Sequence, residues 1–159
     1  MKEIRLVLAA TLVLVVAPAV AHAAAISFTT TIDCPQAAAT IGNPCTCPPG
    51  SGTGSGTLTL DSVSKLVTFS ITTSGTSAPE LFTHVHGPGA PATAAAPVLF
   101  ALPLGDPKVG TYGPLSAAQE TDMLADLHYF NLHTSTCSGG EIRARSSRRR
   151  RSRRSRNGE

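Results

Sequence analysis

Three histidines, His84, His86 and His133, are the residues whose type and spacing best suit chemistry. The stretch around the first two alternates like a β-strand, so His84 and His86 point to one face and Val85 to the other. Two imidazoles on one face can turn toward one ion, and a neighbouring strand can add a third. His133 lies in residues 129–134, a second segment of strand character. Because imidazole suits copper and zinc, the pattern predicts a site for one of these metals.

Two polar residues could support such a site by holding the ligand rings in one orientation. Asn131 shares its predicted strand face with His133, and Glu141 lies on the face opposite Ile142. Either side chain could hydrogen-bond a ligand imidazole and fix which nitrogen carries the proton. A second interpretation makes the histidines structural or surface residues that hydrogen-bond Tyr129, Asn131 or the backbone. The sequence alone leaves both interpretations open.

Other catalytic patterns are weaker. Residues 52–56 combine serine with glycines, but they read as a flexible linker before a strand and not as a nucleophile elbow between strand and helix. Asp122 and Asp126, four residues apart on a predicted helix, suit its solvated face better than a paired-carboxylate site. Cys45 and Cys47 lack the spacing of a redox dithiol. The sequence therefore favours a binding protein over an enzyme, and no catalytic residue is predicted.

The four cysteines are Cys34, Cys45, Cys47 and Cys137. In a small exported domain, four cysteines indicate two disulfides. A bond between Cys45 and Cys47 would close a very short, strained loop. One of these two is therefore expected to bond Cys34 and the other Cys137. A zinc site made of four thiolates is the alternative.

The start of the chain has the composition of a secretory signal peptide. Residues 1–23 combine Lys2 and Arg5, an apolar run over 6–16 and a small-residue cleavage pattern at 21–23. An uncleaved membrane anchor is the alternative, although the run is shorter than the ~20 residues that a membrane span needs. No other segment is long and apolar enough to span. The mature chain is therefore expected to be exported, either secreted or periplasmic.

The end of the chain accounts for its basic balance. Residues 146–159 carry seven arginines and one acid, and such a low-complexity tail is expected to be disordered. The net charge of the chain is +3, whereas residues 24–145 alone carry −4. A nucleic-acid-binding role for the folded body is therefore weakly supported. The tail could contact a polyanion, or it could be a solvated appendage.

Strand patterns dominate the middle of the chain. Alternating apolar, hydroxyl and β-branched residues predict short strands at 26–32, 56–60, 66–73, 81–86, 98–102, 128–134 and 141–145. Residues 34–55 are expected to form a cysteine-held loop, and residues 105–113 a turn-rich link. The one predicted helix covers 116–127, with Ser116 and Gln119 forming a capping box. These elements predict an all-β fold, an antiparallel sandwich or barrel with one short helix.

In combination, several of these segments resemble the CHRD domain, a module named after chordin. The resemblance spans about residues 54–145 and is carried by 56–60, 83–88, 97–100, 115–119, 127, 129–134 and 139–143. It implies an immunoglobulin-like β-sandwich or barrel in an extracellular or periplasmic setting. Residues 24–53 then form a cysteine-containing strand and loop ahead of the domain. The cysteines and the arginine tail depart from the family pattern.

Residues 83–89 are also similar to the copper-ligand strand of copper/zinc superoxide dismutases. Dismutase activity is not expected, because no histidine lies between His86 and His128 to act as the bridging ligand. We expect an exported binding or envelope module whose partner is an unknown extracellular or envelope macromolecule. The alternative is a copper- or zinc-binding protein that uses His84, His86 and His133.

Overall fold

The structure, a computed structural model, describes residues 24–47, 51–90, 95–145 and 147–148. Strands make up nearly half of this part of the chain and helices only about a tenth, so the predicted all-β class is confirmed. The elements, in chain order, are β1 (Ala25–Asp33), α1 (Cys34–Ala38), β2 (Thr53–Asp61), β3 (Val67–Ser74), β4 (Glu80–His86), β5 (Val98–Ala101), β6 (Lys108–Tyr112), α2 (Ala117–Leu124), β7 (Tyr129–Thr134), β8 (Ile142–Arg145) and β9 (Ser147–Arg148).

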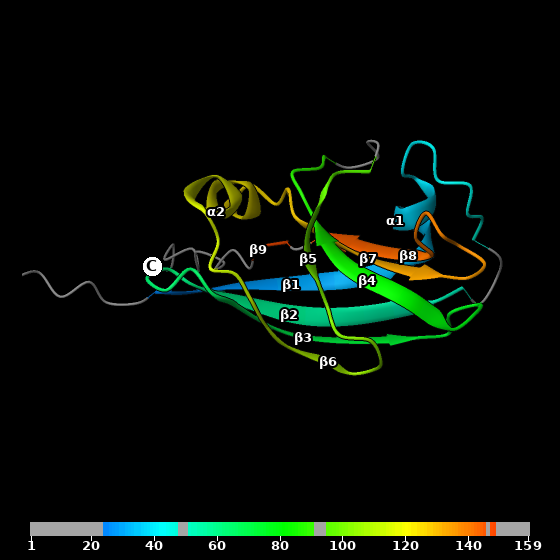
Figure 1. The fold of residues 1–159 in the computed structure, drawn as a ribbon, viewed down its shortest axis with the longest axis horizontal. Helices are drawn as coiled ribbons and strands as arrows, with labels where there is room; N and C mark the ends of the chain where they lie inside the picture. Colours follow the sequence, from blue (N-terminus) through cyan, green and yellow to red (C-terminus); the bar gives the residue numbers. More distant parts are fainter. Residues whose placement is uncertain (1–23, 48–50, 91–94, 146, 149–159) are drawn as a thin grey trace, which may run out of the picture.

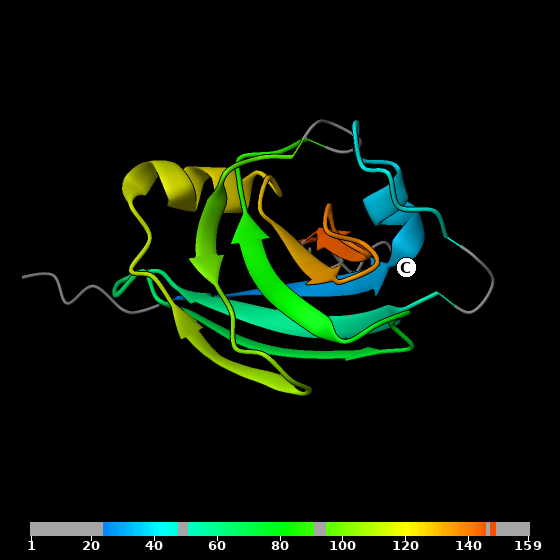
Figure 2. The same ribbon diagram turned by 45° about the vertical axis from the view of Figure 1, so that its right-hand side comes forward.

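The strands form one antiparallel sheet that curls into a nearly closed barrel (Figure 2). The strand order is β5-β4-β7-β8-β1-β2-β3-β6, and β9 pairs with β1. The half that contains β4 and β7 faces the half that contains β2 and β3, and α1 and α2 lie at opposite ends of the barrel (Figure 1). β1 therefore sits in the middle of the sheet, between β2 and β8.

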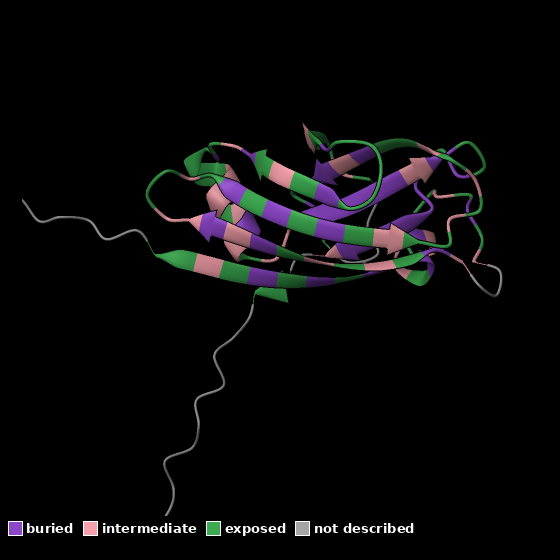
Figure 3. Ribbon diagram, turned by 90° about the horizontal axis from the view of Figure 1, so that it is seen from below, coloured by how far each residue is buried: buried purple, intermediate pink, exposed green. Residues whose placement is uncertain are grey.

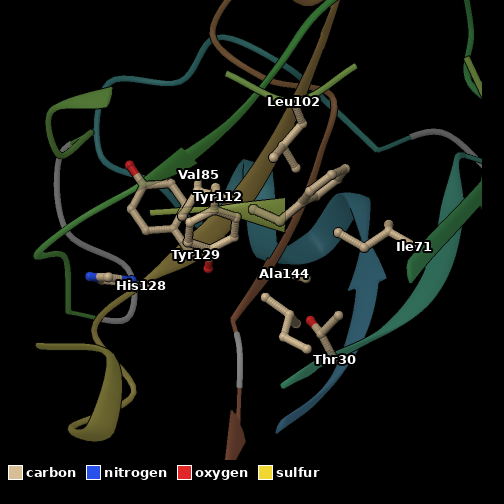
Figure 4. Close-up of a pocket in the computed structure, with 10 residues that line it drawn as sticks. Thr30, Ile71, Val85, Leu102, Tyr112, His128, Tyr129 and Ala144 are labelled. Atoms are coloured by element: carbon tan, nitrogen blue, oxygen red, sulfur yellow. The ribbon is translucent and has the colours of Figure 1, made fainter. Parts of the chain in front are cut away.

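The core lies between the two halves of the sheet. Buried and exposed residues alternate along the long strands, as the bands in Figure 3 show. Val67, Phe69 and Ile71 of β3 are buried, as are Ile142 and Ala144 of β8, which confirms the predicted inward faces of both strands. The core retains a cavity of about 10 Å³ (Figure 4), which holds at most one water.

Both helices begin at a capping side chain. The predicted box is present at α2, where Ser116 Oγ accepts from Gln119 N at 3.2 Å and Gln119 Oε1 accepts from Ser116 N at 2.9 Å. A loop was predicted over residues 34–55. That prediction is wrong for Cys34–Ala38, which form α1. Asp33 caps α1 by accepting from Gln36 N at 2.8 Å, which is a signal that the sequence contains.

The prediction of a flexible linker over 52–56 is also wrong, because β2 begins at Thr53 and pairs with β3 from there. A Cβ at Gly56 would lie 2.8 Å from Ile71 Cγ1, and one at Gly54 would lie closer still to the carbonyl oxygen of Thr72. Larger residues would clash at both positions. The glycines therefore permit close packing of the hairpin and do not indicate mobility.

Residues 105–113, predicted as a turn-rich link, contain the edge strand β6. Its Lys108 is fully buried, and Lys108 Nζ lies 2.7 and 2.6 Å from the two carboxylate oxygens of Glu80. Lys108 Nζ also donates to Gly105 O at 2.6 Å. Because Glu80 begins β4, this ion pair joins the two halves of the sheet near its open edges.

Two disulfides hold residues 34–47, which contain α1 and are called the α1 segment here. Cys34 bonds Cys47, and Cys45 bonds Cys137, which is one of the two pairings that the sequence left open. The alternative of a four-thiolate zinc site is wrong, because all four sulfurs are bonded. The second disulfide joins the α1 segment to the turn between β7 and β8.

The predicted ends fall largely outside the described residues. The signal peptide over 1–23 lies there entirely, and the tail over 146–159 is described only at 147–148. Those two residues form β9 and are not disordered, because β8 pairs with β1 only at Asp33 and leaves the edge of β1 around Phe28 open for pairing. Within the described ranges, no helix has the length and apolar character needed to cross a membrane.

Candidate metal site

The neighbouring strands β4 and β7 position the three histidines. Their antiparallel register places His84 opposite Asn131 and His86 opposite Tyr129, while His133 follows Asn131 by two residues. Residues of the same parity share a face of the sheet, and here that is the face away from the core. The residues between them are buried against the opposite half of the sheet. Two strands thus bring all three predicted ligands to one side.

One ring nitrogen of each histidine lies within 4.8 Å of those of the other two. The ring centroids are 5.3 Å apart for His84 and His133, 5.6 Å for His84 and His86, and 6.0 Å for His86 and His133. Two imidazoles on a tetrahedral metal, each at 2.0–2.1 Å, hold their nitrogens about 3.3 Å apart. The rings therefore need to close by no more than about 1.5 Å to share an ion.

Backbone carbonyls fix the protonated nitrogen in two of the rings. His86 Nδ1 lies 2.8 Å from Ala96 O, and His133 Nδ1 lies 2.8 Å from Ser138 O. A carbonyl oxygen can only accept, so in each neutral ring Nδ1 carries the hydrogen and Nε2 carries the lone pair. Metal-binding histidines have the same arrangement, in which the outer nitrogen donates to a backbone or carboxylate oxygen.

One nitrogen in each of the three rings has no hydrogen-bond partner among the described residues. These nitrogens are His84 Nδ1, His86 Nε2 and His133 Nε2, and all three atoms are buried. A buried polar atom without a partner costs free energy, and native structures contain few of them. Three such atoms within one small cluster leave three lone pairs that a bound ion could use.

Burial also keeps the rings neutral. It lowers the pKa of His84, and the nearby His133 lowers it further. Burial lowers the pKa of His86 as well; the Ala96 carbonyl opposes this shift, while His133, His84 and Arg143 reinforce it. Neutral imidazole is the form that ligates a metal. These two rings therefore keep their lone pairs at a pH where an exposed histidine would begin to protonate.

The two predicted supporting side chains contact other groups. Asn131 Nδ2 donates to Gly139 O at 3.3 Å, and its buried Oδ1 has no hydrogen-bond partner in the described residues. Glu141 Oε1 accepts from Ser77 N at 2.6 Å, and its Oε2 accepts from Thr134 Oγ1 at 2.7 Å. Glu141 thus anchors the loop between β3 and β4. Backbone carbonyls, and not Glu141, hydrogen-bond the imidazoles of His86 and His133.

Tyr129 supports the site in a way that sequence reasoning missed. Its ring lies parallel to that of His86, with centroids 5.0 Å apart, and its hydroxyl accepts from Ala96 N at 2.8 Å. Tyr129 therefore contacts both the His86 ring and the residue whose carbonyl orients that ring. Its parity with Asn131 and His133 was the signal in the sequence.

Arg143 was predicted to face outward, and it does lie on the histidine side of the sheet, but it is buried. Its guanidinium carbon is 3.5 Å from the centroid of the Tyr129 ring, and its Nη1 donates to Thr40 Oγ1. The segment after α1, where Thr40 lies, covers it. No sequence pattern indicated that this segment folds over β8.

His128 does not join the cluster, in agreement with its exclusion from the predicted site. It is buried, and it lines the core cavity together with Tyr129 and Val85 (Figure 4). It directly precedes β7, with the opposite parity to Tyr129. His128 therefore provides a matched control for any experiment on the three clustered histidines.

The family model of the CHRD domain matches residues 36–145. This range includes β2 to β8, all three clustered histidines, and Tyr129 and Arg143. No curated protein and no solved structure matches the chain.

Proposed function

The chain belongs to the CHRD domain family, and on that premise we propose that it is an exported protein that binds one copper or zinc ion through His84, His86 and His133. One observation carries the proposal. One ring nitrogen of each histidine lies within 4.8 Å of those of the other two, and each ring has one buried nitrogen without a hydrogen-bond partner in the described part of the chain. Two of the three rings are already held in the ligating tautomer by backbone carbonyls.

Three features support export. The chain begins with a segment that has the composition of a signal peptide. All four cysteines are paired in disulfides, which persist in oxidising compartments. The family resemblance also implies an extracellular or periplasmic setting. Metal binding is the activity that this arrangement supports by itself, and no catalytic step is assigned to it.

A second candidate function is the binding of an extracellular or envelope macromolecule. Leu81 and Phe82, at the start of β4, are 41% and 56% exposed, and the Phe82 ring stacks on that of His84 with centroids 6.0 Å apart. A partner that covered Phe82 would also cover one wall of the histidine cluster. Contact of a polyanion with the arginine tail remains a separate prediction about residues that lie mostly outside the described ranges.

The test is a metal titration of the full chain, produced in an oxidising compartment so that both disulfides form. Metal stoichiometry is read by mass spectrometry under native conditions for Cu(I), Cu(II) and Zn(II). The parent is compared with His86→Gln, with the triple variant His84→Gln/His86→Gln/His133→Gln, and with His128→Gln as the matched control.

We expect one equivalent of metal in the parent and in His128→Gln, and none in the triple variant. His86→Gln should weaken binding by at least tenfold, because the ring with the most complete support is lost. Absence of bound metal in a folded parent would overturn the proposal, as would equal binding by the parent and the triple variant. In that case the macromolecular partner becomes the leading function.

A further inference from the structure

We infer that the histidine cluster selects monovalent copper over divalent metals. The inference rests on the proposed function and goes further by naming the ion. Two independent features of the site lead to it, the number of ligands that the cluster offers and the charge that lies beside it.

The first feature is the ligand number. In the described residues the cluster consists of three histidines, with no carboxylate or thiolate in the group. Zinc sites with three protein ligands hold a water in the fourth position. Here one nitrogen of each ring is buried, which disfavours a water as the fourth ligand. Cu(I) carries a single charge and is stable with three neutral ligands, whereas Zn(II) and Cu(II) take at least a fourth ligand.

The second feature is an uncompensated positive charge. Arg143 is 4% exposed, and its guanidinium stays protonated at physiological pH. Among the described residues no carboxylate pairs with it; Nη1 donates to Thr40 Oγ1, and Nη2 is buried without a partner. The guanidinium stacks on one face of Tyr129, whose ring in turn stacks on His86. One aromatic ring thus separates this charge from a metal ligand.

No acidic side chain forms an ion pair with Arg143 among the described residues. The carboxylate of Glu141, two residues earlier in the chain, hydrogen-bonds Ser77 and Thr134 and does not pair with Arg143. Arg145, the next outward residue of β8, donates to the backbone carbonyls of Gly89 and Asp126 and adds a second cation to the same face. Imidazole ligates a metal in its neutral form, so the ligands do not offset this charge. A divalent ion therefore experiences twice the repulsion that a monovalent ion does.

The size of this effect is measurable. A unit charge about 8 Å from an ion, at an effective dielectric constant of about 20, changes the binding constant of a monovalent ion on the order of tenfold after screening by salt. For a divalent ion the repulsion energy is twice as large, so the binding constant changes on the order of a hundredfold. Removal of the Arg143 charge should therefore narrow the preference for Cu(I) over Zn(II) by about tenfold.

The experiment measures both affinities on the full, disulfide-bonded chain. Cu(I) is supplied without oxygen and competed against bicinchoninate, and Zn(II) is competed against a zinc-binding dye. The variants are Arg143→Met, which removes the charge, and Arg143→Lys, which keeps the charge but loses the planar stack and the contact with Thr40. Since both variants lose the guanidinium geometry, only the charge distinguishes them.

We expect the parent to bind Cu(I) more than tenfold tighter than Zn(II), with three nitrogen ligands by X-ray absorption. Arg143→Met should narrow that ratio by about tenfold, and Arg143→Lys should leave it within threefold of the parent. Tighter binding of Zn(II) by the parent, or an unchanged ratio in Arg143→Met, overturns the selectivity while the metal site stands. Should Arg143→Met fail to fold, the ratio of Cu(I) to Zn(II) affinity in the parent decides by itself whether the site selects Cu(I). No binding of any metal overturns both proposals.

Discussion

The phenol ring of Tyr129 and the imidazole of His86 lie face to face, 5.0 Å apart at their centroids and 4° from parallel. The Tyr129 hydroxyl also accepts from Ala96 N, and Ala96 O accepts the His86 Nδ1 hydrogen. The three groups therefore form a closed arrangement, in which one side chain supports the ligand ring and the ligand's hydrogen-bond partner at once.

Removal of that hydroxyl should weaken metal binding without removing the stack. In Tyr129→Phe the ring remains against His86, but Ala96 N loses its acceptor and the carbonyl that orients the imidazole is less well held. Outer partners of this kind typically contribute 10–100-fold to metal affinity. We expect at least a tenfold weaker Kd for Cu(I) by bicinchoninate competition. An unchanged Kd would mean that the backbone alone holds the Ala96 carbonyl.

Tyr112→Phe is the matched control, with its own expected result. Tyr112 is buried in the core, its hydroxyl has no hydrogen-bond partner among the described residues, and burial raises its pKa. Removal of a buried group without a partner should leave the protein unchanged or stabilise it by about 1 kcal/mol. Metal affinity should not change. Urea unfolding of the metal-free protein checks the first expectation, and a clear loss of stability would contradict it.

The disulfide between Cys45 and Cys137 should also support metal binding. Cys137 directly precedes Ser138, whose carbonyl fixes the His133 tautomer. Replacement of both cysteines by serine should loosen that turn and weaken Cu(I) binding by about tenfold. The matched control replaces Cys34 and Cys47, whose bond is confined to the α1 segment. That variant should lose up to about 3 kcal/mol of stability but little affinity. Equal affinity losses in both variants would contradict this role of the turn.

The stability of the metal-free protein should fall as the pH drops below about 6.5. Burial lowers the folded-state pKa of His84, His86 and His128, with Asp122 partly opposing the shift at His128. Below the unfolded pKa of about 6.5, the unfolded chain therefore binds more protons than the folded chain. The contribution of these histidines to the free energy of unfolding is complete above about pH 6.5, and it is lost as the pH falls through the lower folded-state pKa values.

Urea unfolding between pH 7 and pH 5 measures this dependence. His128→Gln should make the slope shallower, because one of the three depressed groups is gone. A free energy of unfolding that rose over this interval as the pH was lowered would contradict the prediction.

Replacement of only one partner of the buried ion pair between Lys108 and Glu80 should destabilise the protein. Lys108→Met leaves the Glu80 carboxylate without its cation, and the loss of one partner from a buried pair typically costs about 3–5 kcal/mol. Lys108→Met/Glu80→Gln should recover much of that loss, because no unpaired charge remains. A double-mutant cycle by chemical denaturation measures the coupling. Additive effects of the two single changes would show that the pair contributes no net coupling.

The candidate site was largely predictable because its geometry follows from strand parity. His84 and His86 share a face by their spacing, and only the pairing of β4 with β7 was needed to add His133. The hydrogen-bond partners of the imidazoles were not predictable, since they are backbone carbonyls of loops, at Ala96 and Ser138, and backbone groups carry no residue-specific signal.

The errors in the fold have similar physical causes. Glycine-rich sequence was read as a linker where Gly54 and Gly56 instead allow two strands to pack closely. β6 was missed because its inward face carries a lysine, Lys108, whose partner Glu80 is 28 residues away. Arg143 has the parity of an exposed residue, and only the tertiary placement of the α1 segment buries it.

The position of β1 between β2 and β8 has a consequence for how the chain matures. The sheet cannot be completed until residues 142–145, nearly the end of the folded body, are available to fold, because β8 supplies a neighbour of the first strand. Such long-range pairing folds slowly. Cys34 and Cys47, 13 residues apart, can meet early, whereas Cys45 and Cys137, 92 residues apart, can meet only after the turn between β7 and β8 has been made. Oxidation of the second pair thus marks the finished protein, and the turn that orients His133 is secured last.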